Sequence, residues 1–156
     1  MSTQAKTATD NGLIAKASVS INAPAAKVWQ ALVTPEIVKQ YMFGADVASD
    51  WKPDSPITWK GEWKGKPFED KGTIITIEPE RRLDYSHYSP TSGLPDKPEN
   101  YHTVTYELVE NDGKTNVDLS QDHNADQDAV KHSEQMWQQM LEGLKKVVEA
   151  GTANGD

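Results

Sequence analysis

Three of the four histidines lie where a sheet would bring them together. His102 begins residues 102–108, in which every second residue faces one side, as in a half-buried strand. His87 and His123 take the same alternation near the ends of two neighbouring predicted strands. A neutral imidazole can hydrogen-bond a ligand, act as a general base near neutral pH or ligate a metal. These three side chains define the first candidate site.

The turn between two of these strands is expected to fix their register. Asp112-Gly113 is a two-residue hairpin signal between the predicted strands 102–108 and 114–124. If Asn111 pairs with Lys114, the inward residues oppose one another as Leu108 with Val117, Tyr106 with Leu119, Val104 with Gln121, and His102 with His123. Residues 82–88 add His87 at the same end. The sequence therefore predicts a sheet with an apolar middle and an imidazole-rich rim.

These histidines could ligate a metal, take part in catalysis or line a ligand pocket. Adjacent strands lie about 4.8 Å apart, so the outer two of three imidazoles start roughly 9.6 Å apart, too far for bonds of about 2.1 Å to one zinc without strong curvature. No nucleophile stands beside an evident base and orienter in the sequence. We therefore predict no metal, no cofactor and no assigned catalytic residue. The expected role is a polar lining that orients an apolar ligand, and a general base at His102 or His123 is kept as the alternative.

Aromatic and flexible apolar side chains occupy the same inward positions. Such residues more often simply fill a core, but here we expect some of them to line a cavity between the sheet and the last helix. Methionine thioethers would tolerate varied ligand shapes there. The predicted ligand-binding residues are Trp59, Trp63, Tyr85, His87, His102, Val104, Tyr106, Leu119, Gln121, His123, Met136, Trp137 and Met140.

The elements that position these residues follow the order strand, two short helices, several strands and one long helix. Residues 13–22 alternate as a first strand. Pro24 suits the first turn of a helix that ends near Thr34, and a second helix restarts at Pro35 and stops at Gly44. Strands are predicted around Trp59, at 73–77 and at 82–88, and the long helix over 126–150, ended by Gly151.

The longest irregular stretch is 89–100, which joins two strands that end in histidines. Pro90, Gly93, Pro95 and Pro98 exclude regular structure over a length that is more typical of functional loops. Two interpretations stay open. The loop is either a lid over the histidine rim or a passive surface connection.

Composition narrows the classes of function. A chain of 156 residues suits one domain, expected at 13–150 between a disordered arm at 1–12 and a flexible tail at 151–156. A net charge of −8 with scattered basic residues argues against nucleic-acid or membrane partners. The chain has no cysteine, which excludes disulfides. Residues 1–12 have no apolar run typical of a signal peptide, so a cytoplasmic location is expected, and the oligomeric state stays open.

Short motifs from residue 21 to 149 together resemble the START-like (SRPBCC) superfamily. The motifs are Ile21-Asn22-Ala23-Pro24, Val28-Trp29, Ala31-Leu32, Thr34-Pro35-Glu36, Gly72, Glu78-Pro79 with Arg82-Leu83, residues 104–108, Gly113 with Thr115, and Trp137 with Leu141, Leu144 and Lys145. They look most like the branch related to activators of the heat-shock protein 90 ATPase. Met136, Tyr41 and the segment 121–124 depart from that branch's pattern, so its pocket chemistry is not carried over.

The resemblance implies an α+β helix-grip fold, in which a curved antiparallel sheet wraps a long C-terminal helix, with two short helices after the first strand. It also implies three classes of function. The expected function is binding of a hydrophobic or aromatic small molecule between the sheet and the helix. The alternatives are a cyclase- or hydrolase-like enzyme that uses His102 or His123 as general base, and a chaperone-interacting module.

Overall fold

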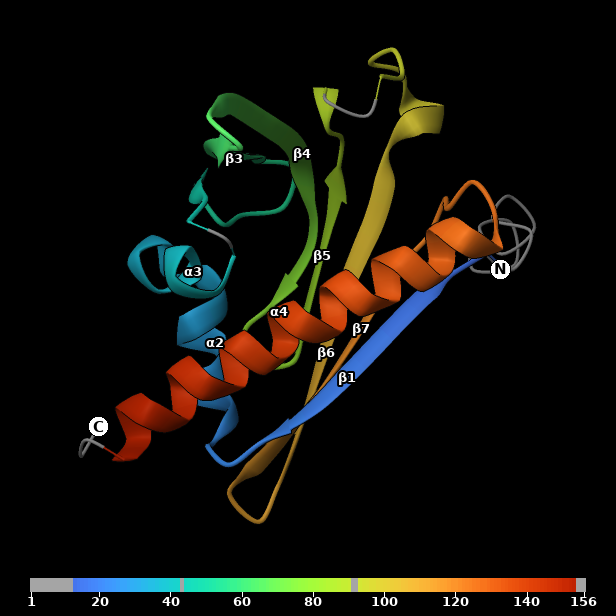
Figure 1. The fold of residues 1–156 in the computed structure, drawn as a ribbon. Helices are drawn as coiled ribbons and strands as arrows, with labels where there is room; N and C mark the ends of the chain where they lie inside the picture. The colour runs from blue at the N-terminus through green and yellow to red at the C-terminus, as the bar shows by residue number, and fades with distance from the viewer. Residues whose placement is uncertain (1–12, 43, 91–92, 154–156) are drawn as a thin grey trace.

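The computed structural model describes residues 13–42, 44–90 and 93–153. The chain forms a helix-grip α+β fold, in which a curved sheet lies against the long helix α4 (Figure 1). The elements in chain order are β1 (Ala15–Ile21), α2 (Ala25–Val33), α3 (Pro35–Tyr41), β2 (Asp46–Ser49), β3 (Pro56–Trp63), β4 (Lys66–Glu78), β5 (Arg82–His87), the 3₁₀ helix η2 (Pro98–Asn100), β6 (His102–Asn111), β7 (Lys114–Gln121) and α4 (Gln127–Ala153).

The strands form one antiparallel sheet in the order β1-β7-β6-β5-β4-β3-β2. The register of β4 against β5 shifts between Ile74 and Thr76. Gly72 approaches β5 so closely that a Cβ atom there would lie 1.7 Å from the carbonyl oxygen of Ser86. A bulge and a glycine are the usual means of bending a sheet. The concave face thus turns towards α4, while α2 and α3 close one end of it (Figure 1).

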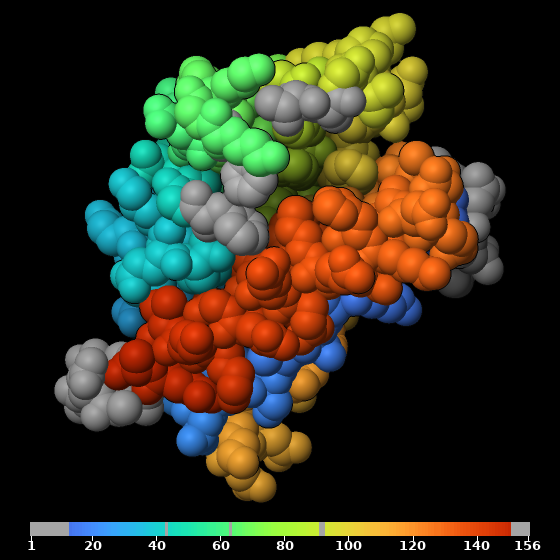
Figure 2. Space-filling model, viewed as in Figure 1, coloured from blue at the N-terminus to red at the C-terminus, as the bar shows by residue number. Residues whose placement is uncertain are grey.

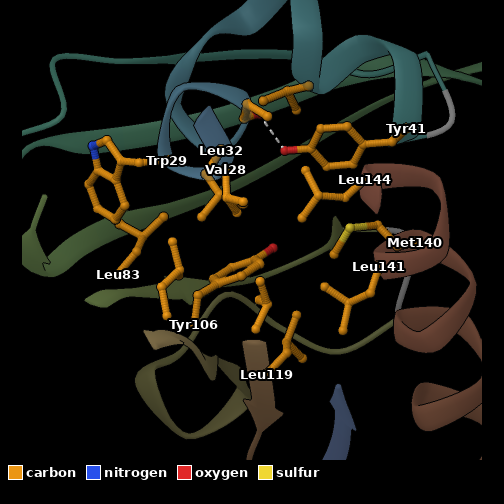
Figure 3. Close-up of a cluster of buried hydrophobic side chains, with 14 of the residues drawn as sticks. Val28, Trp29, Leu32, Tyr41, Leu83, Tyr106, Leu119, Met140, Leu141 and Leu144 are labelled. Carbon is orange, nitrogen blue, oxygen red and sulfur yellow. Dashed lines mark hydrogen bonds between the residues drawn. The ribbon is translucent and has the colours of Figure 1, made fainter. Parts of the chain in front are cut away.

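The core lies between the concave face and the helices. Tyr106 of β6 is 1% exposed and lies between the apolar stripe of α2 and that of α4 (Figure 3). Leu141 and Leu144 of α4 are fully buried. The hydroxyl of Tyr41 donates a hydrogen bond to the carbonyl oxygen of Ala31 at 2.7 Å, which ties α3 to α2 (Figure 3). The apolar stripes seen in the sequence are therefore the packed faces of these helices.

Side chains of α4 cover the free edge of β1. Glu134, Gln138 and Glu149 accept hydrogen bonds from the backbone amides of Lys16, Ser18 and Asn22 at 3.0, 3.3 and 2.8 Å, and Gln138 and Lys145 donate to the carbonyls of Ser18 and Ser20 at 2.9 and 2.8 Å. Four helical residues rise about 6 Å, close to the roughly 6.7 Å spanned by two strand residues. The two periods match well enough for the helix to occupy an edge that would otherwise be open to another strand.

Several predicted elements needed correction. The strand predicted at 73–77 is the end of the longer strand β4, and β2 was not predicted. In residues 66–72 the only large apolar side chain is that of Phe68, so their alternation carries little hydrophobic signal. The helix α4 continues past Gly151 to Ala153, so Gly151 does not end it; glycine has a weak helix propensity but does not forbid helical backbone. In the described part of the chain, no helix is both long enough and apolar enough to cross a bilayer. The predicted arm at 1–12 and the last residues of the predicted tail, 154–156, lie outside the described residues.

Candidate functional site

The predicted register of β6 and β7 is confirmed for most of the hairpin. Asn111 pairs with Lys114, and the observed pairs further along are Leu108 with Val117, Tyr106 with Leu119, and Val104 with Gln121. The predicted pairing of His102 with His123 is wrong. The strand β7 ends at Gln121, and His123 has a φ of +59°, which turns the chain out of the ladder.

A different pair of histidines is formed at this rim. His87 of β5 is the direct partner of His102 of β6. Their ring centroids lie 6.3 Å apart with 30° between the ring planes. The strand alternation placed both residues on the inward face, and the ladder between β5 and β6 brings them together.

A row of rings runs from this pair along the concave face of the sheet. Trp59 lies 5.1 Å from His87 and 5.0 Å from Tyr85, measured between ring centroids, and Tyr85 lies 5.9 Å from Tyr106. Such edge-on and tilted contacts are favourable for aromatic rings. The row therefore continues from the half-buried histidines to the fully buried centre of the core.

The two tyrosines in this row keep their hydroxyls protonated. The Tyr85 and Tyr106 hydroxyl oxygens are hydrogen-bonded at 3.1 Å. Burial raises the pKa of Tyr85 well above its ordinary value, and it also raises that of Tyr106. A hydroxyl pair of this kind offers one donor hydrogen and several lone pairs inside an apolar region.

Both rim histidines are held by carboxyl or carbonyl oxygens. Nε2 of His87 lies 3.0 Å from Oδ2 of Asp70, and Nδ1 of His102 lies 2.8 Å from the carbonyl oxygen of Asp122. Because both partners only accept, these nitrogens carry the protons. Burial lowers the pKa of His102, and the hydrogen bond to Asp122 partly opposes that shift. The imidazole of His102 is therefore neutral at neutral pH.

The segment after β7 links the sheet to α4 through a buried polar network. The indole nitrogen of Trp137 donates to Oε1 of Gln121, and the Gln121 amide donates to Oδ1 of Asn124 at 3.2 Å. Asn124 also donates to the Leu13 carbonyl at 2.9 Å and accepts from the Ser133 hydroxyl at 3.2 Å. Fully bonded networks of this kind fix one packing arrangement. Gln121 thus links Trp137 of α4 to the histidine rim, since its amide nitrogen also lies 3.4 Å from Nδ1 of His102.

A small void lies between the sheet and the helices α2 and α3, and no described residue of α4 lines it. The void that reaches the ring row has a volume of about 10 Å³, room for about one water molecule. Its lining includes Trp59, Tyr85 and Tyr106, together with Met42 and Trp51 from the segments beside α3. The molecular surface is also hollowed between the β3–β4 hairpin and α4, with β5 and β6 at its floor (Figure 2). A ligand of drug size would need these walls to open, because ligand pockets usually measure about 300 Å³ or more.

The structure places most of the predicted binding residues on the concave face. Trp59, Tyr85, Val104, Tyr106, Leu119 and Gln121 are buried there, and His87 and His102 are half-buried. Trp137 and Met140 are buried on α4. Met136 is 36% exposed, so it does not belong to the packed face of α4. Trp63 pairs with Lys66 at the end of β3, and its side chain lies outside the described residues. A ligand contact at each of these residues stays a prediction.

Asp70, whose carboxylate forms a hydrogen bond with His87, was not among the residues predicted from the sequence. The alternation of Phe68, Asp70, Gly72 and Ile74 along β4 carries the necessary signal, since Ile74 is buried and the others are half-buried on the same face. The signal is missed when the strand is begun at Thr73. No group of three histidine, aspartate or glutamate side chains in the described residues is arranged to hold a metal ion.

The loop after β5 is anchored on the side of the sheet away from the histidines. Asp96 pairs with Lys71 at 2.5 Å and accepts a hydrogen bond from the Tyr101 hydroxyl at 2.6 Å. Tyr88 stacks on Tyr101 and donates to the Leu94 carbonyl at 2.6 Å. Lys71 follows Asp70 in β4, and Tyr88, which pairs with Lys71, follows His87 directly after the end of β5, so both take the outward alternation. These contacts favour a connector over a lid, and the lid stays a prediction that exchange measurements can test.

The curved antiparallel sheet, the long C-terminal helix and the inward ring row define a helix-grip domain of the START-like superfamily. The family model described as "Activator of Hsp90 ATPase homolog 1-like protein" matches residues 22–149, and the chain belongs to this family. The resemblance drawn from the sequence motifs is thereby confirmed. No curated protein matches the chain.

Solved structures agree with this assignment. A solution structure of a protein from Cytophaga hutchinsonii is 54% identical, with a TM-score of 0.78 over 90% of this chain and 96% of that one. A crystal structure of a protein from Nitrosomonas europaea is 21% identical, with a TM-score of 0.72 over 92% of this chain and 99% of that one. The Aha1 dimer from Colwellia psychrerythraea is 20% identical, with a TM-score of 0.69 over 88% of this chain and 97% of that one. The latter two likenesses show the fold alone.

Proposed function

We propose that the chain binds a small hydrophobic or aromatic molecule on the concave face of its sheet, against the ring row from His102 to Tyr106. The row supports the proposal because it is continuous from the half-buried rim to the void in the core. Apolar walls with a few convergent polar groups are the usual composition of a small-molecule site.

Binding would require the site to open. The void of about 10 Å³ is bordered by Met42 and Trp51, which come from segments outside the strands and are half-buried. Short segments of this kind open at lower free-energy cost than core strands. We therefore expect these side chains to move when a ligand enters, while the strands β5 and β6 stay in place.

The proposal is tested with naphthalene as probe and two matched variants. Trp59 contacts both His87 and Tyr85 in the row, whereas Trp29 of α2 is similarly buried but makes none of these ring contacts. We expect naphthalene to shift amide NMR signals of β5 and β6, and Trp59→Leu to weaken binding about tenfold. Trp29→Leu should leave the affinity within about twofold once the variant is shown to be folded. Equal losses in the two variants would contradict a site at the ring row.

The second candidate is a protein-interaction module, which the small volume of the void favours. A core filled by its own side chains needs no ligand, and the family description points to heat-shock protein 90 as the partner to test. The measurement is the ATPase rate of that chaperone with and without the chain. Stimulation, together with no NMR response to naphthalene, would replace the first proposal with this one.

The general-base alternative at His102 or His123 stays a prediction. Burial lowers the pKa of His102, so its imidazole is uncharged at neutral pH, and a general base must start in the unprotonated state. A binder should keep its affinity for naphthalene, which has no hydrogen-bond donor, when either histidine becomes glutamine, whereas an enzyme should keep binding but lose turnover by about 100-fold or more.

A further inference from the structure

The rim beside His87 presents two hydrogen-bond acceptors that receive no hydrogen bond from the described residues. They are Oδ1 of Asp70 and Nε2 of His102, which lie on either side of the His87 ring. We propose that the ligand carries a hydrogen-bond donor at its polar end, an uncharged hydroxyl or N–H group, and that carboxylates and other anions are rejected. This inference rests on the proposed binding function and specifies the chemical class of the ligand.

The first acceptor is a carboxylate oxygen on the concave face. Asp70 shares the inward alternation of β4 with the buried Ile74. Its Oδ2 is held by His87 at 3.0 Å, but its Oδ1 is buried and meets no hydrogen-bond donor among the described residues. An ionised carboxylate can only accept, and a buried acceptor without a donor costs free energy. A donor on the ligand would remove that cost.

The second acceptor follows from the tautomer of His102. Its Nδ1 lies 2.8 Å from the Asp122 carbonyl and 3.4 Å from the Gln121 amide nitrogen. The Gln121 amide orientation is set by Trp137, which donates to its oxygen. The shorter contact is with an acceptor, so Nδ1 carries the proton and Nε2 holds the lone pair. In the described part of the chain, Nε2 makes no hydrogen bond of its own.

The charges near the rim also disfavour an anionic ligand. Asp70 and Asp122 place two carboxylates beside the histidines, and the Asp122 side chain is only 4% exposed. The lysine next in sequence, Lys71, faces outward and is paired with Asp96. The chain as a whole carries a net charge of −8. An anionic ligand would therefore enter against the local and the overall field.

The test compares four probes with the same ring system on the unmodified chain at pH 7.5. They are naphthalene, 2-naphthol, 2-methoxynaphthalene and 2-naphthoate, and their dissociation constants are measured by NMR titration. The hydroxyl of 2-naphthol donates, the methyl ether only accepts, and naphthoate is an anion. We expect 2-naphthol to bind at least about tenfold more tightly than the ether and the anion, because only it supplies the missing hydrogen.

Two variants distinguish the loss of the Asp70 acceptor from the general effect of removing one negative charge. Asp70→Asn replaces an acceptor with an amide of the same shape and should reduce the preference for 2-naphthol over the ether to about threefold or less. Asp84→Asn is the control. Asp84 is also a buried carboxylate, and one of its oxygens has no hydrogen-bond donor among the described residues, but it lies on the outward alternation of β5, paired with Arg82 at 2.9 Å. Asp84→Asn should keep the full preference for 2-naphthol over 2-methoxynaphthalene.

The outcomes distinguish the inference from the function on which it rests. If all four probes bind with similar affinity, or the ether or naphthoate binds best, the binding function stands and the donor inference is wrong. If none of the four binds, the proposed function fails and the inference fails with it. If Asp70→Asn does not fold, the probe series on the unmodified chain still decides.

Discussion

His87 and His102 are direct partners across β5 and β6, with ring centroids 6.3 Å apart. His87 is held by the carboxylate of Asp70 and His102 by the carbonyl of Asp122. Burial, together with the neighbouring His87, lowers the pKa of His102. The pair therefore makes the stability of this end of the sheet sensitive to pH.

The first prediction concerns that sensitivity. Burial lowers the pKa of His102 in the folded chain below its ordinary value of 6.5, so below that pH the unfolded chain binds the proton more readily. Stability should fall as the pH drops from 6.5 to the lowered pKa, with a slope of up to about 1.4 kcal/mol per pH unit.

Urea unfolding at a series of pH values checks this prediction. The difference in unfolding free energy between the unmodified chain and His102→Gln should shrink as the pH falls. The variant His132→Gln is the control, because His132 is exposed on α4 and should leave the pH dependence unchanged. A constant difference between the unmodified chain and His102→Gln at all pH values would contradict the assigned pKa shift.

The second prediction compares two positions on α4. Leu144 and Met140 are both at most 2% exposed, and neither lines the void. Replacing either with alanine removes a packed side chain and should lower the unfolding free energy by about 2–5 kcal/mol. Denaturant unfolding measures both losses. A much smaller loss for Met140→Ala would mean that Met140 faces a cavity larger than the one seen here.

The third prediction concerns the bend between β4 and β5. Gly72→Ala should lower the unfolding free energy by about 3 kcal/mol or more, because its Cβ would lie 1.7 Å from a backbone carbonyl that cannot move alone. Gly143→Ala on α4 is the comparison, since its nearest contact is the Tyr41 Cβ at 3.2 Å and alanine favours a helix. We expect Gly143→Ala to change stability by less than about 1 kcal/mol.

The fourth prediction concerns the covered edge of β1. The double variant Glu134→Ala with Gln138→Ala removes the acceptors for the amides of Lys16 and Ser18. Hydrogen exchange at these two amides should accelerate, while exchange in the β6–β7 hairpin stays unchanged. Exposing this edge should also raise the tendency to self-associate, which sedimentation would detect. Unchanged exchange at both amides would show that water replaces the lost side chains without cost.

The fifth prediction concerns the loop between β5 and β6. Asp96→Asn weakens the ion pair with Lys71, so amide exchange in residues 93–100 should accelerate with little change in global stability. Naphthalene affinity should stay the same if the loop is a connector. Slower exchange in the unmodified loop when naphthalene binds would instead support the lid interpretation.

The sequence by itself determined the features that depend on local periods. The alternation in β6 and β7 and the Asp112-Gly113 turn were enough to predict the pairs from Asn111–Lys114 to Val104–Gln121. The apolar stripe of α4 and the motifs shared with the START-like superfamily could also be identified in the sequence. Each of these depends on residues that are close in the chain or repeat with a fixed period.

The tertiary structure decided the contacts that depend on distant segments. His123 leaves the ladder at a residue with positive φ, and Asp70 lies within hydrogen-bond distance of His87 where the glycine at position 72 lets β4 approach β5 closely. The volume left between the sheet and the helices α2 and α3 depends on how all the side chains pack together, so no local pattern could predict that the void is only about 10 Å³. Side-chain packing and chain bending are cooperative properties of the whole domain, and they set the chemistry of the rim.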